Sequence, residues 1–153
     1  MNQYVPQSAR LEPNWIQERQ LRLTQVSATT CDWLRDHGSL TARLKRSCPD
    51  RFRVRVINQG RGSPLYSEGR LLRMRRGEAA IVREVELLCD EVPWVFARTV
   101  IPVSSLRGAV KRLTMLGSKP LGEVLFADPR TRRVVMEMAR LHGRHRMYHA
   151  AVA

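Results

Sequence analysis

The residue whose setting most strongly suggests chemistry is Arg83. Residues 79–89 alternate as a half-buried strand does, and one face holds Arg83 among aliphatic neighbours: Ile81, Val85 and Leu87, with Cys89. Glu84 and Glu86 fall on the opposite face. A guanidinium in an apolar setting needs a partner, because an unpaired buried charge is very costly. That partner could be a protein carboxylate or a bound anionic ligand. Alternatively, the side chain extends to water at the sheet edge, and periodicity alone favours this last interpretation.

Two other groups of side chains have residue types that could bind a metal or act as nucleophiles. A helix would place three histidines near one face, which a zinc site needs: His142, His145 and His149. Arginines surround these histidines and no carboxylate lies nearby, so we expect a solvated basic tail and no metal. The three cysteines are an odd number, far apart and without a C-x-x-C pair: Cys31, Cys48 and Cys89. Their spacing argues against a disulfide framework and for a reducing cytoplasm, with Cys89 as a packed small residue rather than a nucleophile.

Composition sets wider limits on the class of protein. The chain has 153 residues, of which 43% are hydrophobic, so we expect a single domain over residues 1–153 with a real core. It contains no apolar run of about 18 residues, and residues 1–10 do not form a signal peptide. P-loop, G-x-G-x-x-G, H-E-x-x-H and G-x-S-x-G motifs are absent from the sequence, so no cofactor is expected.

The chain is strongly basic, with 27 Lys and Arg against 14 Asp and Glu, a net charge of +13. The excess lies in residues 43–83, with 12 basic against 3 acidic, and residues 130–153, with 6 against 1. This charge gives non-specific affinity for polyanions. Only 6% of residues are aromatic, so no stacking platform for nucleic acid is visible and no specific nucleic-acid partner is expected.

The elements that must position Arg83 follow from local patterns. Residues 1–27 contain prolines and no sustained period, and we expect a loosely packed arm. Thr29 or Thr30 caps a short helix that ends near Gly38, and Ser39 caps a second helix that Pro49 stops. This helix–turn–helix shape is typical of a DNA-reading motif or of a structural lid, and the shortness of the helices favours the lid.

Strands and then helices fill the rest of the chain. Strands are expected over residues 51–56, 69–76, 79–89 and 94–101, with a loop over 58–67. In the first of these strands the arginines should face water. Helices are expected from Ser104 or Ser105 to Leu116 and from Pro129 through Leu141, with one turn over residues 123–126. Short turns between successive strands favour an antiparallel sheet, and the element order predicts an α+β domain.

A series of short motifs supports a family resemblance. Its clear part runs from Arg83-Glu84-Val85-Glu86-Leu87-Leu88-Cys89, through Pro93-Trp94 and Ala97-Arg98-Thr99-Val100-Ile101-Pro102, to Leu116-Gly117 and Lys119-Pro120-Leu121-Gly122. Trp33-Leu34 and Ser39-Leu40-Thr41 extend it upstream. In order and spacing this series resembles the chorismate pyruvate-lyase family.

The resemblance implies a fold, a reaction and a set of binding groups. The implied fold is a small antiparallel sheet with helical flaps over a buried site. The implied reaction converts chorismate to 4-hydroxybenzoate and pyruvate for ubiquinone biosynthesis, without metal or organic cofactor, in a cytoplasmic monomer. Arg83 would bind the ring carboxylate, and the backbone N–H groups of Leu40 and Leu121 would complete the anion pocket. The same fold also serves as the effector domain of some repressors, which is the alternative reading: a non-catalytic module for a small aromatic carboxylate.

The C-terminal part departs from the family pattern. The family continues with a strand that carries a glutamate in a Leu-x-Glu-x-Phe-Leu-Pro setting, and the sequence shows no counterpart. Residues 140–153 are instead an atypical tail rich in His and Arg. The catalytic residue is therefore not assigned, and we expect a truncated or frame-shifted C-terminus and impaired turnover.

Overall fold

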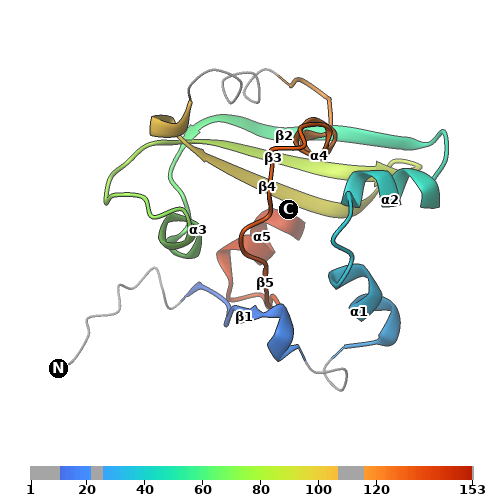
Figure 1. The fold of residues 1–153 in the computed structure, drawn as a ribbon, viewed down its shortest axis with the longest axis horizontal. Coiled ribbons are helices and arrows are strands. Elements are labelled where there is room, and N and C mark those ends of the chain that lie inside the picture. Colours follow the sequence, from blue (N-terminus) through green and yellow to red (C-terminus); the bar gives the residue numbers. More distant parts are fainter. Residues whose placement is uncertain (1–10, 22–25, 107–115, 153) are drawn as a thin grey trace.

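The computed structural model describes residues 11–21, 26–106 and 116–152, and its elements form an α+β fold, as expected. The helical elements are η2 (Glu18–Gln20), α1 (Ala28–Leu34), α2 (Leu40–Ser47), α3 (Tyr66–Leu71), η4 (Val103–Ser105), α4 (Leu121–Ala127) and α5 (Arg146–Val152). The strands are β1 (Ile16–Gln17), β2 (Phe52–Gly62), β3 (Ala80–Cys89), β4 (Val92–Pro102) and β5 (Glu137–Met138). Figure 1 shows the larger sheet across the upper part, with α1, β1, β5 and α5 below it. The helix expected from Ser104 or Ser105 to Leu116 lies largely outside the described residues.

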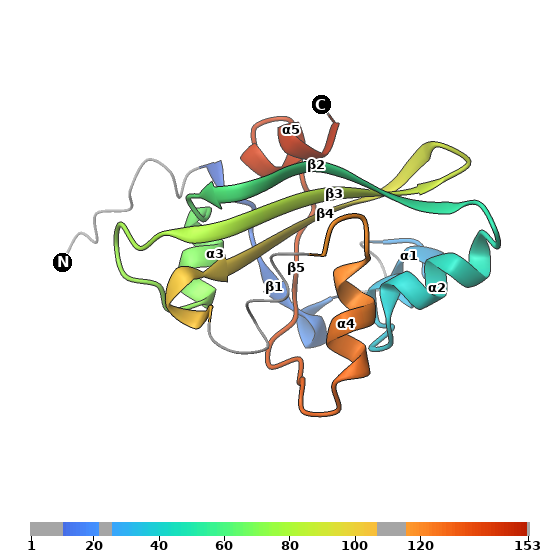
Figure 2. The same cartoon turned by 90° about the horizontal axis from the view of Figure 1, so that it is seen from above.

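The larger sheet is an antiparallel meander in the order β2-β3-β4. Figure 2 shows its three strands side by side, with α2 near one end and α3 near the other. Asp90 and Glu91 join β3 to β4 in a two-residue turn, and both have positive φ, 50° and 63°. Two residues in this conformation match the twist of a hairpin. The strands expected over residues 79–89 and 94–101 are therefore confirmed.

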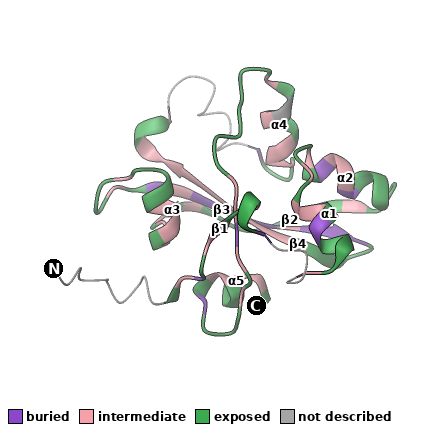
Figure 3. Cartoon of the chain, turned by 60° about the horizontal axis from the view of Figure 1, so that its bottom comes forward, coloured by how far each residue is buried: buried purple, intermediate pink, exposed green. Residues whose placement is uncertain are grey.

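One face of this sheet is covered by α1 and α2. Ser39 begins α2 as expected, because its hydroxyl accepts a hydrogen bond from the backbone N–H of Ala42 at 3.2 Å. Leu44 of α2 is buried against Val85 and Leu87 of β3, with partly buried residues around them: Trp33, Phe52, Val54, Val95 and Ala97. Figure 3 shows the buried residues following β3 and these two helices. The two helices thus cover the face of β3 that carries Arg83.

The opposite face of the sheet carries the carboxylates of β3, as the alternation predicts. Arg98 of β4 lies across from Glu84 and forms ion pairs with Glu84 and with Glu68 of α3. Residues 69–76 are not the strand that we expected, because α3 occupies the first part of that segment. Glu68 stabilises its first turn by accepting a hydrogen bond from the backbone N–H of Leu65 at 2.7 Å.

The segment over residues 11–21 is packed onto the rest of the chain, unlike the loosely packed arm that was expected. β1 pairs antiparallel with β5, and Leu21 is buried with Cys31 and Met138. The helix expected over residues 129–141 is also wrong, since β5 lies within it and Val134 is 90% exposed. Pairing with β1 uses the backbone groups that a helix would have satisfied internally.

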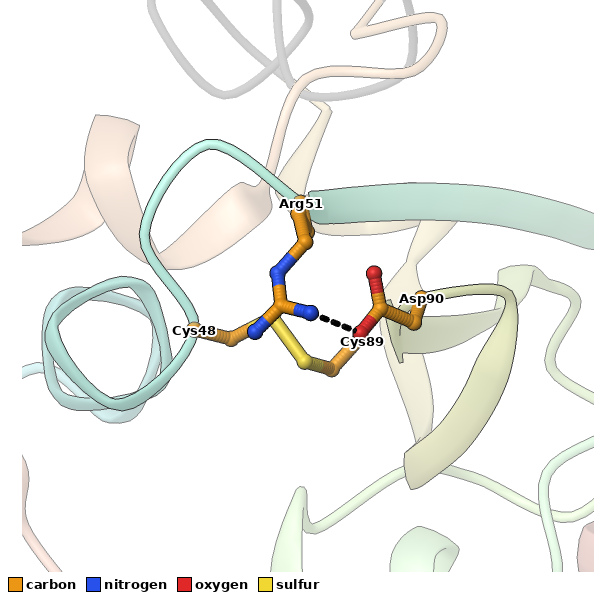
Figure 4. Close-up of a disulfide and its surroundings, with 4 residues drawn as sticks. All are labelled: Cys48, Arg51, Cys89 and Asp90. Atoms are coloured by element: carbon orange, nitrogen blue, oxygen red, sulfur yellow. Dashed lines mark hydrogen bonds and ion pairs between the residues drawn. A yellow bond between two sulfur atoms is a disulfide. The ribbon is translucent and has the colours of Figure 1, made fainter.

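The cysteines differ most clearly from expectation. Cys48 and Cys89 form a disulfide, with 6.0 Å between their Cα atoms, and Cys31 is free and buried. An odd number of cysteines leaves one unpaired but does not prevent the other two from pairing. Cys48 and Cys89 are far apart in the sequence, but the fold places the end of α2 beside the end of β3. Figure 4 shows the Arg51–Asp90 ion pair next to the two sulfur atoms.

The histidines of the C-terminal segment do not share a helical face. His142 precedes α5, and its backbone N–H donates to Nδ1 of His145 at 2.8 Å. His145 is 2% exposed. Across the described parts of the chain, no helix is long and apolar enough to cross a membrane.

Acid is expected to destabilise this segment through His145. Burial, and then the charges of Arg144 and His142, lower the pKa of His145 below its usual value of 6.5, and Glu12 opposes them weakly. The unfolded chain then binds the proton more readily than the folded chain, so stability falls as the pH drops below about 6.5. The urea midpoint should be lower at about pH 5.5 than at about pH 7.5, and His145→Asn should reduce this difference. An equal pH difference in the variant would contradict the assignment.

Candidate functional site

The candidate site is built around Arg83, which is 5% exposed in the middle strand of the sheet. Its side chain lies on the face covered by α1 and α2, as the alternation predicts. Nη1 donates to Oε1 of Gln59 on β2, and Nη2 donates to the backbone carbonyl of Lys119 at 3.2 Å. Both acceptors are neutral, so these two hydrogen bonds orient the guanidinium without compensating its positive charge.

Arg98 provides a comparison on the neighbouring strand. Its side chain is 12% exposed, and this burial acts to lower its pKa. Ion pairs with two carboxylates, Glu68 and Glu84, together outweigh burial and raise the pKa above its usual value. Arg83 forms no ion pair with the acidic residues that the structure describes, and burial lowers its pKa. A buried guanidinium with unused charge is suited to an anionic ligand, and a carboxylate can accept two parallel hydrogen bonds from it.

An irregularity in β2 brings Gln59 to Arg83. The register between β2 and β3 shifts between Val56 and Asn58, so Asn58 lies opposite Glu84 and Gln59 lies opposite Arg83. Strict alternation from Phe52 would have put Gln59 on the other face. Beyond this bulge β2 continues to Gly62, whereas the sequence predicts a loop over residues 58–67.

Two helices begin beside this arginine. Leu40 is the first residue of α2 and Leu121 the first of α4, and the first N–H groups of a helix have no acceptor within it. Lys119, which accepts from Arg83, lies two residues before α4. α2 and α4 are in contact, and Lys45 of α2 forms an ion pair with Glu123 of α4. The structure therefore brings the segments of Leu40, Leu121 and Arg83 together.

Gly122 allows the close approach of the two helices. A Cβ atom at this position would lie 3.0 Å from Oγ1 of Thr41, which is buried, and 3.9 Å from Oγ of Ser39. Gly122→Ala is therefore expected to push α4 away from α2 and to weaken binding of an aromatic carboxylate about fivefold or more. Gly143→Ala is the matched control, since a Cβ atom there meets nothing within 4 Å. Equal affinity of the two variants, measured by calorimetry, would contradict this role for Gly122.

A large hollow elsewhere in the molecule does not contain this site. It has a volume of about 1060 Å³ and lies between α1, β1, β5 and the residues before α5. Trp15, Met138 and His145 are among its lining residues, whereas Arg83, Leu40 and Leu121 are not. We place the candidate anion site at Arg83 because its charge is buried there and forms no ion pair with a described carboxylate. No cluster of three or more metal-ligating side chains occurs among the described residues.

The sequence predicts Arg83 as a site residue from the residues themselves, and Leu40 and Leu121 only through the family resemblance. It missed Gln59, because the bulge that turns this residue toward Arg83 has no signal in the alternation. It also missed the carbonyl of Lys119 and the approach of Gly122 to Thr41. The tight Ser118-Lys119-Pro120 connection ahead of α4 was the one available hint.

Comparison with known proteins agrees with the family resemblance seen in the sequence. The family model described as "Chorismate lyase" matches residues 11–151. Proteins named "Probable chorismate pyruvate-lyase" are similar to most of the chain. That of Methylococcus capsulatus is 50% identical over 74% of this chain and 70% of its own length. Those of Aromatoleum aromaticum and Thiobacillus denitrificans are 46% and 40% identical, over 84% and 96% of this chain and 69% and 76% of their own lengths.

Proposed function

Because the chain belongs to the chorismate lyase family, we propose that it converts chorismate to 4-hydroxybenzoate and pyruvate, the step that supplies the aromatic ring for ubiquinone. The observation that carries this proposal most directly is Arg83, whose buried guanidinium has two neutral hydrogen-bond acceptors and no ion pair with a described carboxylate. A carboxylate on the ring of the substrate would supply the missing charge.

The three predicted binding residues have complementary roles in this proposal. Arg83 pairs with the ring carboxylate, while the backbone N–H groups of Leu40 and Leu121 donate to the same anion. Contact between α2 and α4 supports this, because it holds the first turns of both helices near the strand that carries Arg83. Hydrogen bonds from charged or backbone donors to a carboxylate in a water-poor site are strong.

The protein's contribution to the reaction is positioning. Chorismate loses its enolpyruvyl group as pyruvate together with a ring proton, and the gain of aromaticity drives the step. Holding the ring at one end, away from water, places the departing group in a fixed orientation. We propose that the reaction proceeds without a metal or organic cofactor, in a monomer located in the cytoplasm.

The direct test is to incubate the purified chain with chorismate and to follow 4-hydroxybenzoate by absorbance and pyruvate by mass. We expect both products in equal amounts above the rate in buffer alone. Arg83→Ala is the control and should remove the enzymatic excess. Tight binding of 4-hydroxybenzoate with no product formed would contradict the lyase activity and would indicate the non-catalytic binding module instead.

A further inference from the structure

The Cys48–Cys89 disulfide joins the two elements that build the anion site. Cys48 is the residue directly after α2, and Cys89 is the last residue of β3. Leu40 lies at the other end of α2, about 12 Å along the helix axis. Arg83 lies on β3 itself. The bond is therefore a covalent link between α2, called the lid helix below, and β3, the strand that carries Arg83.

The described side-chain contacts of α2 with other elements are weaker than this tie. Leu44 packs on β3. Lys45 pairs with Glu123 of α4, with both side chains nearly half exposed. Arg43 pairs with Asp32 and Asp36 and lies 3.9 Å from the ring centroid of Trp33, so these contacts tie α2 to the α1 region rather than to the sheet. The disulfide is thus the one covalent contact that the structure describes between α2 and the sheet, beside the packing of Leu44 on β3.

We propose that Cys48 and Cys89 form a reversible redox site whose state sets how tightly the anion site closes on its ligand. This inference rests on the proposed function. In the reducing direction, two molecules of a low-molecular-weight thiol supply two electrons and two protons. The S–S bond breaks, two cysteine thiols form, and the small thiols leave joined as their own disulfide. The reverse exchange restores the protein disulfide, and a bond of this kind in the cytoplasm is typically transient or redox-sensing.

A surface ion pair lies beside the sulfur atoms. Cys48 and Cys89 are only 1% and 6% exposed. Arg51 and Asp90 pair directly beside them (Figure 4), and their side chains are 60% and 50% exposed. This pair can separate without disturbing the core, which would let a small thiolate approach.

The experiment compares the oxidised and reduced forms of the same full-length chain. The protein is equilibrated with oxidised or with reduced glutathione, its free thiols are counted by alkylation and mass, and 4-hydroxybenzoate binding is measured by calorimetry. We expect the oxidised form to bind about tenfold more tightly. Cys48→Ala/Cys89→Ala should bind like the reduced form in both buffers, while Cys31→Ala should respond to glutathione like the parent chain.

Three outcomes would overturn the redox site. The first is that three free thiols remain after treatment with oxidised glutathione. The second is that the oxidised and reduced forms bind 4-hydroxybenzoate with affinities within twofold of each other. If neither form binds 4-hydroxybenzoate, the proposed function fails, and amide hydrogen exchange of α2 decides the redox inference alone. Slower exchange in the oxidised form supports the tie, and equal exchange is the third overturning outcome.

A pair of matched variants tests the access route. Asp90→Asn removes the ion pair beside the disulfide, and asparagine tolerates the positive φ at this position. Glu91→Gln is the control, because Glu91 is the other residue of the same turn and its ion pair is with Arg53 of β2. We expect Asp90→Asn to be reduced by glutathione several-fold faster than Glu91→Gln, and equal rates would show that the Arg51–Asp90 pair does not gate access.

Discussion

Replacing Arg83 with methionine is expected to weaken binding of 4-hydroxybenzoate about 100-fold or more. The ligand carboxylate would lose the cationic partner that the proposed pocket provides within the described part of the chain. The free energy of unfolding should stay the same or rise, because the folded chain no longer has to bury a guanidinium without a counter-charge. Calorimetry gives the affinity, and urea unfolding gives the stability.

Arg98→Met is the matched control and should show the opposite pattern. Its removal leaves Glu68 and Glu84 largely buried without their cation, so we expect a loss of about 3 kcal/mol in unfolding free energy. The affinity for 4-hydroxybenzoate should change only as far as the loss of stability lowers the folded fraction. If Arg83→Met instead destabilised the chain as strongly as Arg98→Met and kept its affinity, Arg83 would be a structural residue and the anion site would be wrongly placed.

The contrast between these arginines also shows what the sequence alone can predict. A period of two along residues 79–89 was sufficient to separate Arg83 from Glu84 and Glu86, because side chains on a strand alternate strictly between faces. A turn over residues 90–93 and the capping of α2 by Ser39 were equally predictable, since both depend on neighbouring residues, although β4 begins earlier than predicted, at Val92. The antiparallel sheet and the α+β class follow from such local signals.

Features that depend on contacts between distant segments were not predictable in this way. The partner of Arg83, Gln59, is set by a bulge in β2, and the alternation of β2 continues too briefly to locate it. The apolar residues after Pro129 have helical spacing, but β5 pairs with β1, which is more than 100 residues earlier in the chain. Nothing local to either segment indicates that pairing.

The disulfide was missed for the same reason, and its removal is the second change with a large expected effect. Cys48 and Cys89 are separated by 41 positions, and their bond closes a loop of that length in the unfolded chain. Losing this restraint raises the entropy of the unfolded state, which should lower the unfolding free energy by about 4 kcal/mol. Urea unfolding of the oxidised chain, and of the same chain kept reduced by an excess of a small dithiol, measures the difference.

Two comparisons separate this loop effect from simple loss of packing. Cys48→Ala/Cys89→Ala removes the bond together with two buried sulfur atoms, whereas reduction of the parent chain removes only the bond. If the tie acts through the unfolded state, both should lose most of the same stability, and Cys31→Ala, which changes a buried cysteine outside the pair, should lose far less. A reduced parent chain as stable as the oxidised one would contradict this loop effect. Because this effect acts on the unfolded chain, the position of α2 on β3 is measured separately, by ligand binding and amide hydrogen exchange in the two redox forms.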